Sequence, residues 1–129
     1  MQALHFSETF RGAAITLQAL PMGDDLAIAL CGGERPHIGA VAVAEPHPAL
    51  NDPARASATA STIARLGHKE DVLARDLANR IAAATGRVVA LACGIHYDDL
   101  RPEEIDAVTA VAGRLADRLL LALRQQSSR

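Results

Sequence analysis

The chain of 129 residues carries 13 basic and 15 acidic side chains, for a formal net charge of −2, and its length suits a single domain over residues 1–129. The balanced charge, with two Phe, one Tyr and no Trp, argues against nucleic-acid binding, which usually needs a basic face and stacking aromatic rings. The N-terminus shows no signal sequence, and the longest apolar run, residues 88–93, is too short to cross a bilayer. We therefore expect a cytoplasmic protein whose cysteines, Cys31 and Cys93, are free thiols.

The first third of the chain predicts strands separated by turns. Apolar and polar side chains alternate with a period of two over residues 3–10 and 13–20, and the alternation returns over 26–30 after a turn at 21–25. Residues 39–44 consist only of Gly, Ala and Val. This composition predicts another short strand, buried on both faces.

The middle of the chain is rich in proline. Pro46, Pro48 and Pro53 predict a loop or an irregular edge over residues 45–56. Residues 57–63 then alternate hydroxyl and methyl groups, which predicts a strand with one packed side and one side in solvent.

The last part predicts a helix, a strand and a second helix. A helical period runs from residue 68 to residue 85 with Gly86 as its stop, and residues 87–95 are typical of a central strand. The second helix is expected over residues 100–124, while residues 125–129 should fray.

The start of the second predicted helix has an unusual cap. Pro102 fits the first turn, and Ile105 belongs to the stripe that we expect to be buried. Arg101 is a poor N-cap residue, so we expect Asp98 or Asp99 to cap the helix instead. The elements together predict an α/β (α+β) fold, with a mixed or antiparallel sheet of five to six strands and two helices packed on it.

Three histidines, His37, His68 and His96, lie where a predicted strand meets a turn or a helix start. Histidine titrates near neutrality and is the most frequent metal ligand, so these positions predict a site for a divalent metal such as zinc, joined by Glu70 or Asp98. Their separation of about thirty residues is not that of a compact metal motif. The alternative interpretation is that each histidine caps or hydrogen-bonds a turn.

Gly67, His68 and Lys69 open the first predicted helix, and Lys69 is the only lysine in the chain. The free N–H groups of a helix start favour an anion, and Lys69 adds a positive charge, so a phosphate site is one interpretation. Glu70 and Asp71 oppose it because they occupy the same end of the helix. A solvated helix start is the alternative.

A thiol nucleophile is a third interpretation, because Cys31 and Cys93 lie near histidines and Asp98 and Asp99 offer an acid or a base. Cys93 falls inside an apolar strand, where a thiol is usually inert. The chain has no G-x-S-x-G, P-loop or G-x-G-x-x-G sequence, so acyl transfer, NTP hydrolysis and Rossmann dinucleotide binding lack their usual motifs.

Three clusters follow one another along the chain: GERPHIG at 33–39, GHKED at 67–71, and GIH with LRPEEI within 94–105. In this order they resemble the prenylated flavin chaperone family typified by LpdD, from about Arg11 to Leu123. That family includes the small D subunits that accompany UbiD-type gallate and protocatechuate decarboxylases. Two departures are Arg101, where a Thr cap is expected, and the proline-containing insert at 45–56.

The resemblance implies a fold similar to the small proteasome-assembly chaperones, usually dimeric, and a non-catalytic accessory role. It implies that the chain binds, delivers or matures prenylated FMN for a UbiD-type decarboxylase. Glu70 is among the positions that match the family's clusters. The candidate cofactor-binding residues are Gly67, His68, Lys69, His37 and His96, and the candidate metal ligands are His37, His68 and His96.

Two other functions stay open at this point. The first alternative to the chaperone role is a small metal-dependent enzyme that uses the three histidines. The second is a purely structural subunit of a decarboxylase. We expect the three histidines to converge near one edge of the sheet with Lys69 close by.

Overall fold

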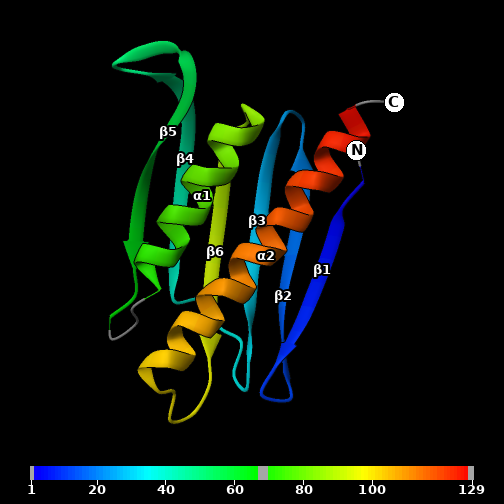
Figure 1. Ribbon diagram of the computed structural model, residues 1–129, viewed down its shortest axis with the longest axis vertical. Coiled ribbons are helices and arrows are strands. Elements are labelled where there is room, and N and C mark those ends of the chain that lie inside the picture. Colours follow the sequence, from blue (N-terminus) through cyan, green and yellow to red (C-terminus); the bar gives the residue numbers. More distant parts are fainter. Residues whose placement is uncertain (1, 67–69, 128–129) are drawn as a thin grey trace.

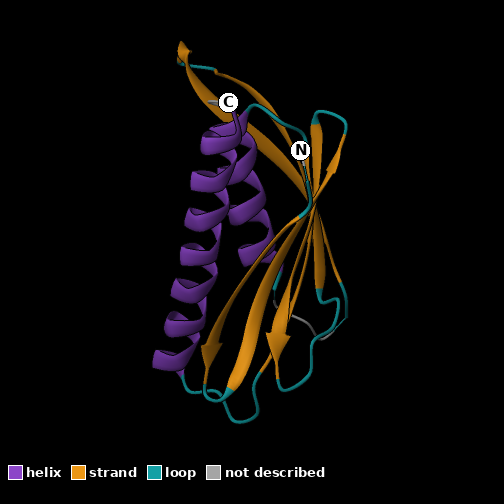
Figure 2. Cartoon of the chain, turned by 90° about the vertical axis from the view of Figure 1, so that its right-hand side faces the viewer, coloured by secondary structure: helices purple, strands orange, loops and turns teal. Residues whose placement is uncertain are grey.

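The computed structural model describes residues 2–66 and 70–127, which form a six-stranded mixed sheet with two helices on one of its faces (Figures 1 and 2). The predicted α+β fold class is therefore confirmed. The elements in chain order are β1 (Leu4–Phe10), β2 (Ala13–Met22), β3 (Asp25–Gly33), β4 (Ala40–Ala49), β5 (Asp52–Ala64), α1 (Asp71–Thr85), β6 (Val89–His96) and α2 (Pro102–Ser127).

The strand order across the sheet is β1-β2-β3-β6-β4-β5. β3 and β6 are parallel, and the other neighbouring strands are antiparallel. As predicted, β6 is a central strand. The two parallel strands end on the same side of the molecule, at the bottom of Figure 1.

The first hairpin is closed by Arg11 and Gly12, which both have positive φ values, 51° and 76°. A two-residue turn of this kind matches the right-handed twist of the strands that it joins. It sets the register in which the alternating side chains Ile15, Leu17 and Ala19 of β2 point toward the helices and are buried.

Residues 45–56 were predicted to be a loop or an irregular edge; the loop is wrong, whereas the irregular edge agrees with the register shift between Pro48 and Ala49. These residues form the outer half of a long hairpin, in which β4 and β5 pair as far as Ala49 and Asp52. β6 pairs with β4 only from Ala40 to Ala44, so Pro46 and Pro48 lie where β4 has a neighbour on one side only. A proline there has no ladder hydrogen bond to lose on its open side, and the strand tolerates it.

The prediction that residues 39–44 are buried on both faces is also wrong. Ala40, Ala42 and Ala44 are buried, whereas the Val43 side chain is 43% exposed on the opposite face. The reason is architectural, because both helices cover the same face of the sheet and leave the other face open (Figure 2).

The core lies between the sheet and the helices. It combines branched side chains such as Leu91 and Ile81 with alanines, among them Ala74, Ala78 and Ala82 of α1. Small side chains at these positions let the helix lie close to the strands. α1 ends at Gly86, whose φ of 69° is the left-handed C-cap conformation that the sequence predicts.

The two helices differ from the predictions at their ends and at Ile105. Within the described residues α1 begins at Asp71, and α2 continues to Ser127 where fraying was predicted. The side-chain hydrogen bond found at the start of α2 does not involve Asp98 or Asp99: the Glu104 carboxylate accepts the Arg101 backbone N–H at 3.2 Å. This hydrogen bond is the largest cause that lowers the pKa of Glu104. Ile105 is 51% exposed, and is not part of the buried stripe.

Neither α1 nor α2, as far as the described residues go, is long and apolar enough to span a membrane.

Leu91 offers a test of the core, because it is fully buried in β6 between Ile28 and Ala42 of the neighbouring strands. We expect Leu91→Ala to lower the free energy of unfolding by about 2–5 kcal/mol, from lost burial and the cavity left behind. Leu121→Ala is the matched control, since Leu121 is 50% exposed on α2, and should change stability by less than about 0.5 kcal/mol. Urea unfolding measures both, and equal losses would contradict this core.

Candidate functional site

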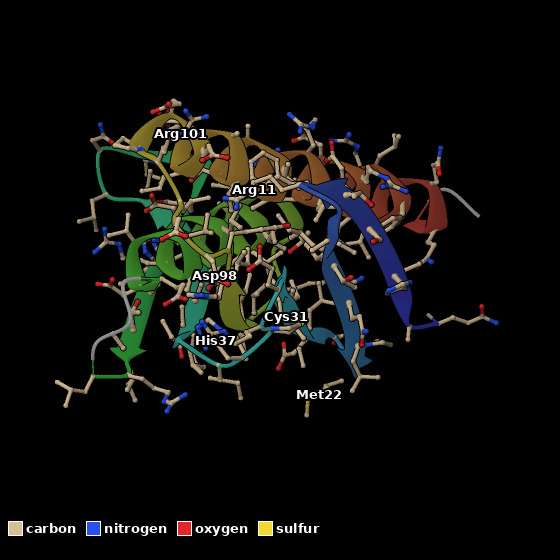
Figure 3. All side chains as sticks on the ribbon, turned by 90° about the horizontal axis from the view of Figure 1, so that it is seen from below. Arg11, Met22, Cys31, His37, Asp98 and Arg101 are labelled. Carbon is tan, nitrogen blue, oxygen red and sulfur yellow. The ribbon has the colours of Figure 1, made fainter. Side chains whose placement is uncertain are left out.

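A pocket of about 850 Å³ lies between the first turns of α1 and α2, at the carboxyl ends of β3 and β6. Figure 3 views the molecule from this end, with His37 and Asp98 labelled. Ligands of α/β proteins commonly bind at the carboxyl ends of parallel strands, and ligand pockets commonly have volumes of roughly 300–1,000 Å³.

The inner wall of the pocket is aliphatic. It is formed by side chains from both helices, from the end of β6 and from the segment before α2: Val72, Leu73, Ile95, Leu100, Ile105 and Val108. Val72 and Ile105 are each 51% exposed, although they come from different helices. Exposed aliphatic surface on two walls of one pocket is typical of a site that an apolar part of a ligand covers.

The rim of the pocket is polar and carries both signs of charge. Its residues are Arg35, His37, Glu70, Asp76, His96 and Thr109. Arg35 and His37 come from the connection between β3 and β4, and His96 ends β6. The rim can therefore contact the polar and anionic groups of a ligand whose apolar part lies against the aliphatic wall.

His37 is held by contacts on both nitrogens of its ring. Its Nδ1 lies 3.0 Å from the Arg35 carbonyl oxygen, and its Nε2 lies 2.8 Å from Glu70 Oε1. The ring is thus held between a backbone carbonyl and a side-chain carboxyl group, which fixes its orientation in the pocket. The His37 and Glu70 side chains are only 19% and 16% exposed, which fixes this pair in the pocket wall.

Two glycines make room for this pair. A Cβ atom on Gly94 would overlap the His37 carbonyl group, and one on Gly39 would overlap the Glu70 carboxylate. The glycines of the first and third sequence clusters are thus required by the close approach of the backbone to site residues.

His96 belongs to a second, more exposed cluster. Its Nε2 lies 2.8 Å from Asp98 Oδ1, and Arg35 Nη2 lies 3.0 Å from both of these atoms. The hydrogen bond with His96, followed by those with Glu34 and Arg35, lowers the pKa of Asp98 to about 2. Asp98 therefore stays ionised and keeps Arg35 and His96 together at the rim.

Arg11 connects this cluster to the start of α2. Its guanidinium donates to the Asp98 carbonyl oxygen at 3.0 Å and lies 3.6 Å from a Glu104 carboxylate oxygen. It also lies over the Tyr97 ring, 5.8 Å from the centroid, and Tyr97 is buried against Phe10. The turn between β1 and β2 thereby positions the segment that follows β6.

The structure brings His37 and His96 to one pocket at the ends of central strands. Gly67, His68 and Lys69 lie outside the described residues, so the convergence of all three histidines stays a prediction. Within residues 2–66 and 70–127, no three His, Cys, Asp or Glu side chains are grouped so as to hold a metal ion. The metal site of His37, His68 and His96 accordingly stays a prediction as well.

The two cysteines do not contribute to the pocket lining. Both are free thiols, as predicted, and Cys93 is buried. Burial, with smaller contributions from Glu70 and Cys31, raises the pKa of Cys93 to about 12. A thiol that stays protonated at neutral pH is a poor nucleophile, which agrees with the prediction that Cys93 is inert.

Sequence reasoning missed Arg35 and the aliphatic wall as parts of the site. Arg35 lies inside the GERPHIG cluster, and this position beside His37 is the feature of the sequence that could have identified it as a site residue. Ile105 has the helical spacing of a core residue, and only the position of α1 relative to α2 decides that it faces a pocket.

Comparisons with known proteins agree with this architecture. A family model described as "Prenylated flavin chaperone LpdD-like domain" matches residues 9–124. The fold is similar to that of a chain in the crystal structure of a chaperone complex for yeast 20S proteasome assembly, with a TM-score of 0.52 and 18% sequence identity. That match covers 97% of this chain and 98% of the other, and at this identity it shows the fold alone. No curated protein sequence matches the chain.

The Asp98 cluster predicts a specific titration. We expect the Asp98 carboxyl in the wild-type protein to titrate near pH 2, and His96→Ala to move its pKa up toward the ordinary value of 3.8, because the hydrogen bond with His96 is the largest cause of the shift. Since the folded-state pKa is lowered, this contact stabilises the fold above about pH 4 and its contribution is lost as the pH falls toward 2.

Carbon-detected NMR of the Asp98 side chain measures this pKa. His47→Ala is the control, because His47 contacts Pro48 and Thr59 in the β4–β5 hairpin and should leave Asp98 unchanged. A wild-type value near 3.8 would show that the cluster does not form as described.

Proposed function

The chain belongs to the prenylated flavin chaperone LpdD-like family, and from this membership we propose that it binds prenylated FMN in the pocket between α1 and α2 and delivers it to a UbiD-type decarboxylase. The observation that carries the proposal is the half-exposed aliphatic wall of that pocket beside a polar rim on which Arg35 is exposed. In this proposal the chain is a non-catalytic accessory protein.

The aliphatic wall suits the apolar part of such a cofactor. A prenylated flavin is a broad ring system enlarged by an apolar ring, and Val72 and Ile105 offer it contact surface from two sides. Covering these exposed side chains removes apolar surface from water, which favours binding by about 25 cal/mol per Å².

The rim suits the anionic part. Arg35 is 71% exposed and reaches His96 at the edge of the pocket, so its guanidinium is accessible to a phosphate group. Guanidinium groups bind phosphate through paired hydrogen bonds. In the proposed site His37 and His96 contact the cofactor, and Gly67, His68 and Lys69, which lie outside the described residues, belong to the same proposed cofactor-binding set.

We further propose that the working unit is a homodimer in the cytoplasm and that its partner is the decarboxylase. A divalent metal held by His37, His68 and His96 remains a separate prediction. Metal analysis of the purified protein, repeated with His37→Ala and His96→Ala, tests it, and unchanged metal content in both variants would rule out this set of ligands.

Ile105→Asp tests cofactor binding at the pocket. Removing an aliphatic wall and placing a carboxylate there should weaken the binding of prenylated FMN by about 10–100-fold, from the loss of some 1.5–3 kcal/mol of apolar contact. Flavin fluorescence titration of the purified chain measures the dissociation constant.

Leu121→Asp is the matched control, because Leu121 is on the same helix with a similar exposure of 50% and does not line the pocket. It should bind prenylated FMN as the wild type does. Equal affinity of the wild type and both variants would place the cofactor elsewhere, or show that the chain does not bind it.

Decarboxylase activation tests the biological role. Co-expression of the wild-type chain with a UbiD-type decarboxylase and a flavin prenyltransferase should raise decarboxylase activity, and Leu121→Asp should do the same. Ile105→Asp should lose the effect, because the variant cannot carry the cofactor. Activity is measured on the purified decarboxylase, together with its flavin absorbance.

Activity measurements on the isolated chain and on the co-expressed decarboxylase together separate the competing functions. Turnover by the isolated chain that disappears when metal is stripped would favour a metal-dependent enzyme. Activation that persists in Ile105→Asp and after replacement of His37 and His96 would favour a structural subunit, and either result would contradict cofactor delivery through this pocket.

A further inference from the structure

We propose that the pocket between α1 and α2 holds a flavin in one orientation, with the pyrimidine edge of the ring system at Asp76 and Thr109 and the phosphate at Arg35. This inference rests on the proposed function and adds to it two residues that determine specificity. They bind the ligand at the end of the pocket away from the strand ends.

The two helices line the pocket in matched turns. Both begin at the end of the molecule where β3 and β6 end, the lower end in Figure 1, and run away from it. On α1 the lining residues Val72 and Asp76 are four positions apart, and on α2 the same spacing separates Ile105 and Thr109. Residues four apart lie on one face of a helix, about 6 Å apart along its axis. An aliphatic pair near the strand ends is therefore followed, one turn further along, by a polar pair.

The groove between the helices is closed one turn beyond the polar pair. Arg80 follows Asp76 by four residues, and Gly113 follows Thr109 by the same number. Arg80 Nη1 donates a hydrogen bond to the Gly113 carbonyl oxygen at 3.2 Å, and the same guanidinium is paired with Asp117. This bridge joins α1 to α2. A ligand that enters from the strand ends thus meets Asp76 and Thr109 at the far end of the groove.

The polar pair can bind an N–H group that lies beside a carbonyl group. The Asp76 side chain is 64% exposed, and its Oδ1 lies 3.7 Å from Arg75 Nε, which is too long for a hydrogen bond. The carboxylate can therefore accept a hydrogen bond from a ligand, and the exposed Thr109 hydroxyl can donate one. The pyrimidine ring of a flavin carries an imide N–H between two carbonyl groups, so its edge presents the complementary pattern.

Charge and solvation select this orientation over the reverse one. A phosphate beside Asp76 would be repelled, whereas the exposed Arg35 at the other end attracts it. The apolar benzenoid edge would remove water from the Asp76 carboxylate without replacing its hydrogen bonds, which is unfavourable. With the pyrimidine edge at the polar pair, the apolar half of the ligand lies one turn nearer the strand ends, against Val72 and Ile105.

NMR of prenylated FMN labelled with ¹⁵N at the imide nitrogen tests the orientation directly. When it is bound to the wild-type chain, the imide proton should be visible and protected from exchange with water, because it is hydrogen-bonded. In Asp76→Ala the imide signal should be lost to exchange, and the dissociation constant should rise about 10-fold, since a hydrogen bond to a charged group is lost. Thr109→Val should weaken binding about 3-fold, and Thr109→Ser, which keeps the hydroxyl, should bind as the wild type does.

Two further variants separate the ends of the pocket. Asp106→Ala removes an exposed carboxylate of α2 that does not line the pocket, and it should change neither the affinity nor the imide signal. Arg35→Ala should weaken binding but leave the imide proton of the bound fraction protected. Circular dichroism checks that each variant is folded.

The outcomes distinguish this inference from the proposed function. A wild-type chain that does not bind prenylated FMN would overturn both. A wild type that binds the cofactor, together with an Asp76→Ala variant of equal affinity and with the same protected imide proton, would overturn only the orientation. An imide proton that is protected in Asp76→Ala and exposed in Arg35→Ala would show that the ligand lies the other way round.

Discussion

The parallel pairing of β3 with β6 is the constraint on which the rest of the structure depends. Its register runs from Leu26 opposite Val89 to Gly33 opposite His96, so both strands end at the same side of the sheet. The connection that leaves β3 carries Arg35 and His37, and β6 ends in His96. Residues far apart in the chain therefore meet at one pocket. Gly33, with a φ of 79°, permits the close approach, because a Cβ there would overlap the His96 carbonyl group.

The shortage of bulky side chains explains how the layers are arranged. Alanines on α1 and on the central strands let the helices pack closely on one face, where the core is continuous. The pocket occupies the space between the first turns of the two helices, where Val72 and Ile105 stay half exposed. The part of the chain that the structure describes has two helices, both on one face, and no further element that covers the other face of the sheet. The pocket and the open face are thus consequences of the same composition.

Most of the fold was predictable because period-two alternation and helix stop signals are local. The alternation of β2 and the left-handed Gly86 were confirmed on these grounds. The burial of residues 39–44 could not be predicted, since nothing within that segment records which sheet face the helices cover. Pro46 and Pro48 suggested a loop because the sequence does not reveal that β4 has lost its β6 neighbour at that point.

The site was predictable only in part, for a similar reason. Histidines at element ends pointed to His37 and His96, and the resemblance to a family rested on the order of the clusters around them. The contribution of Arg35 and the exposure of Ile105 depend on how distant elements pack, which spacing along the chain does not encode.

The ion pair at the rim affects how strongly the pocket can hold an anionic ligand. Arg35 is paired with Asp98 at 3.0 Å, and both side chains are exposed, so the pair contributes little to stability and Arg35 can exchange Asp98 for a phosphate at small cost. Asp98 nevertheless stays ionised, since its pKa is lowered to about 2, and it competes for Arg35 while the ligand is bound. Under the proposed function, such competition would limit the affinity for the cofactor and favour its transfer.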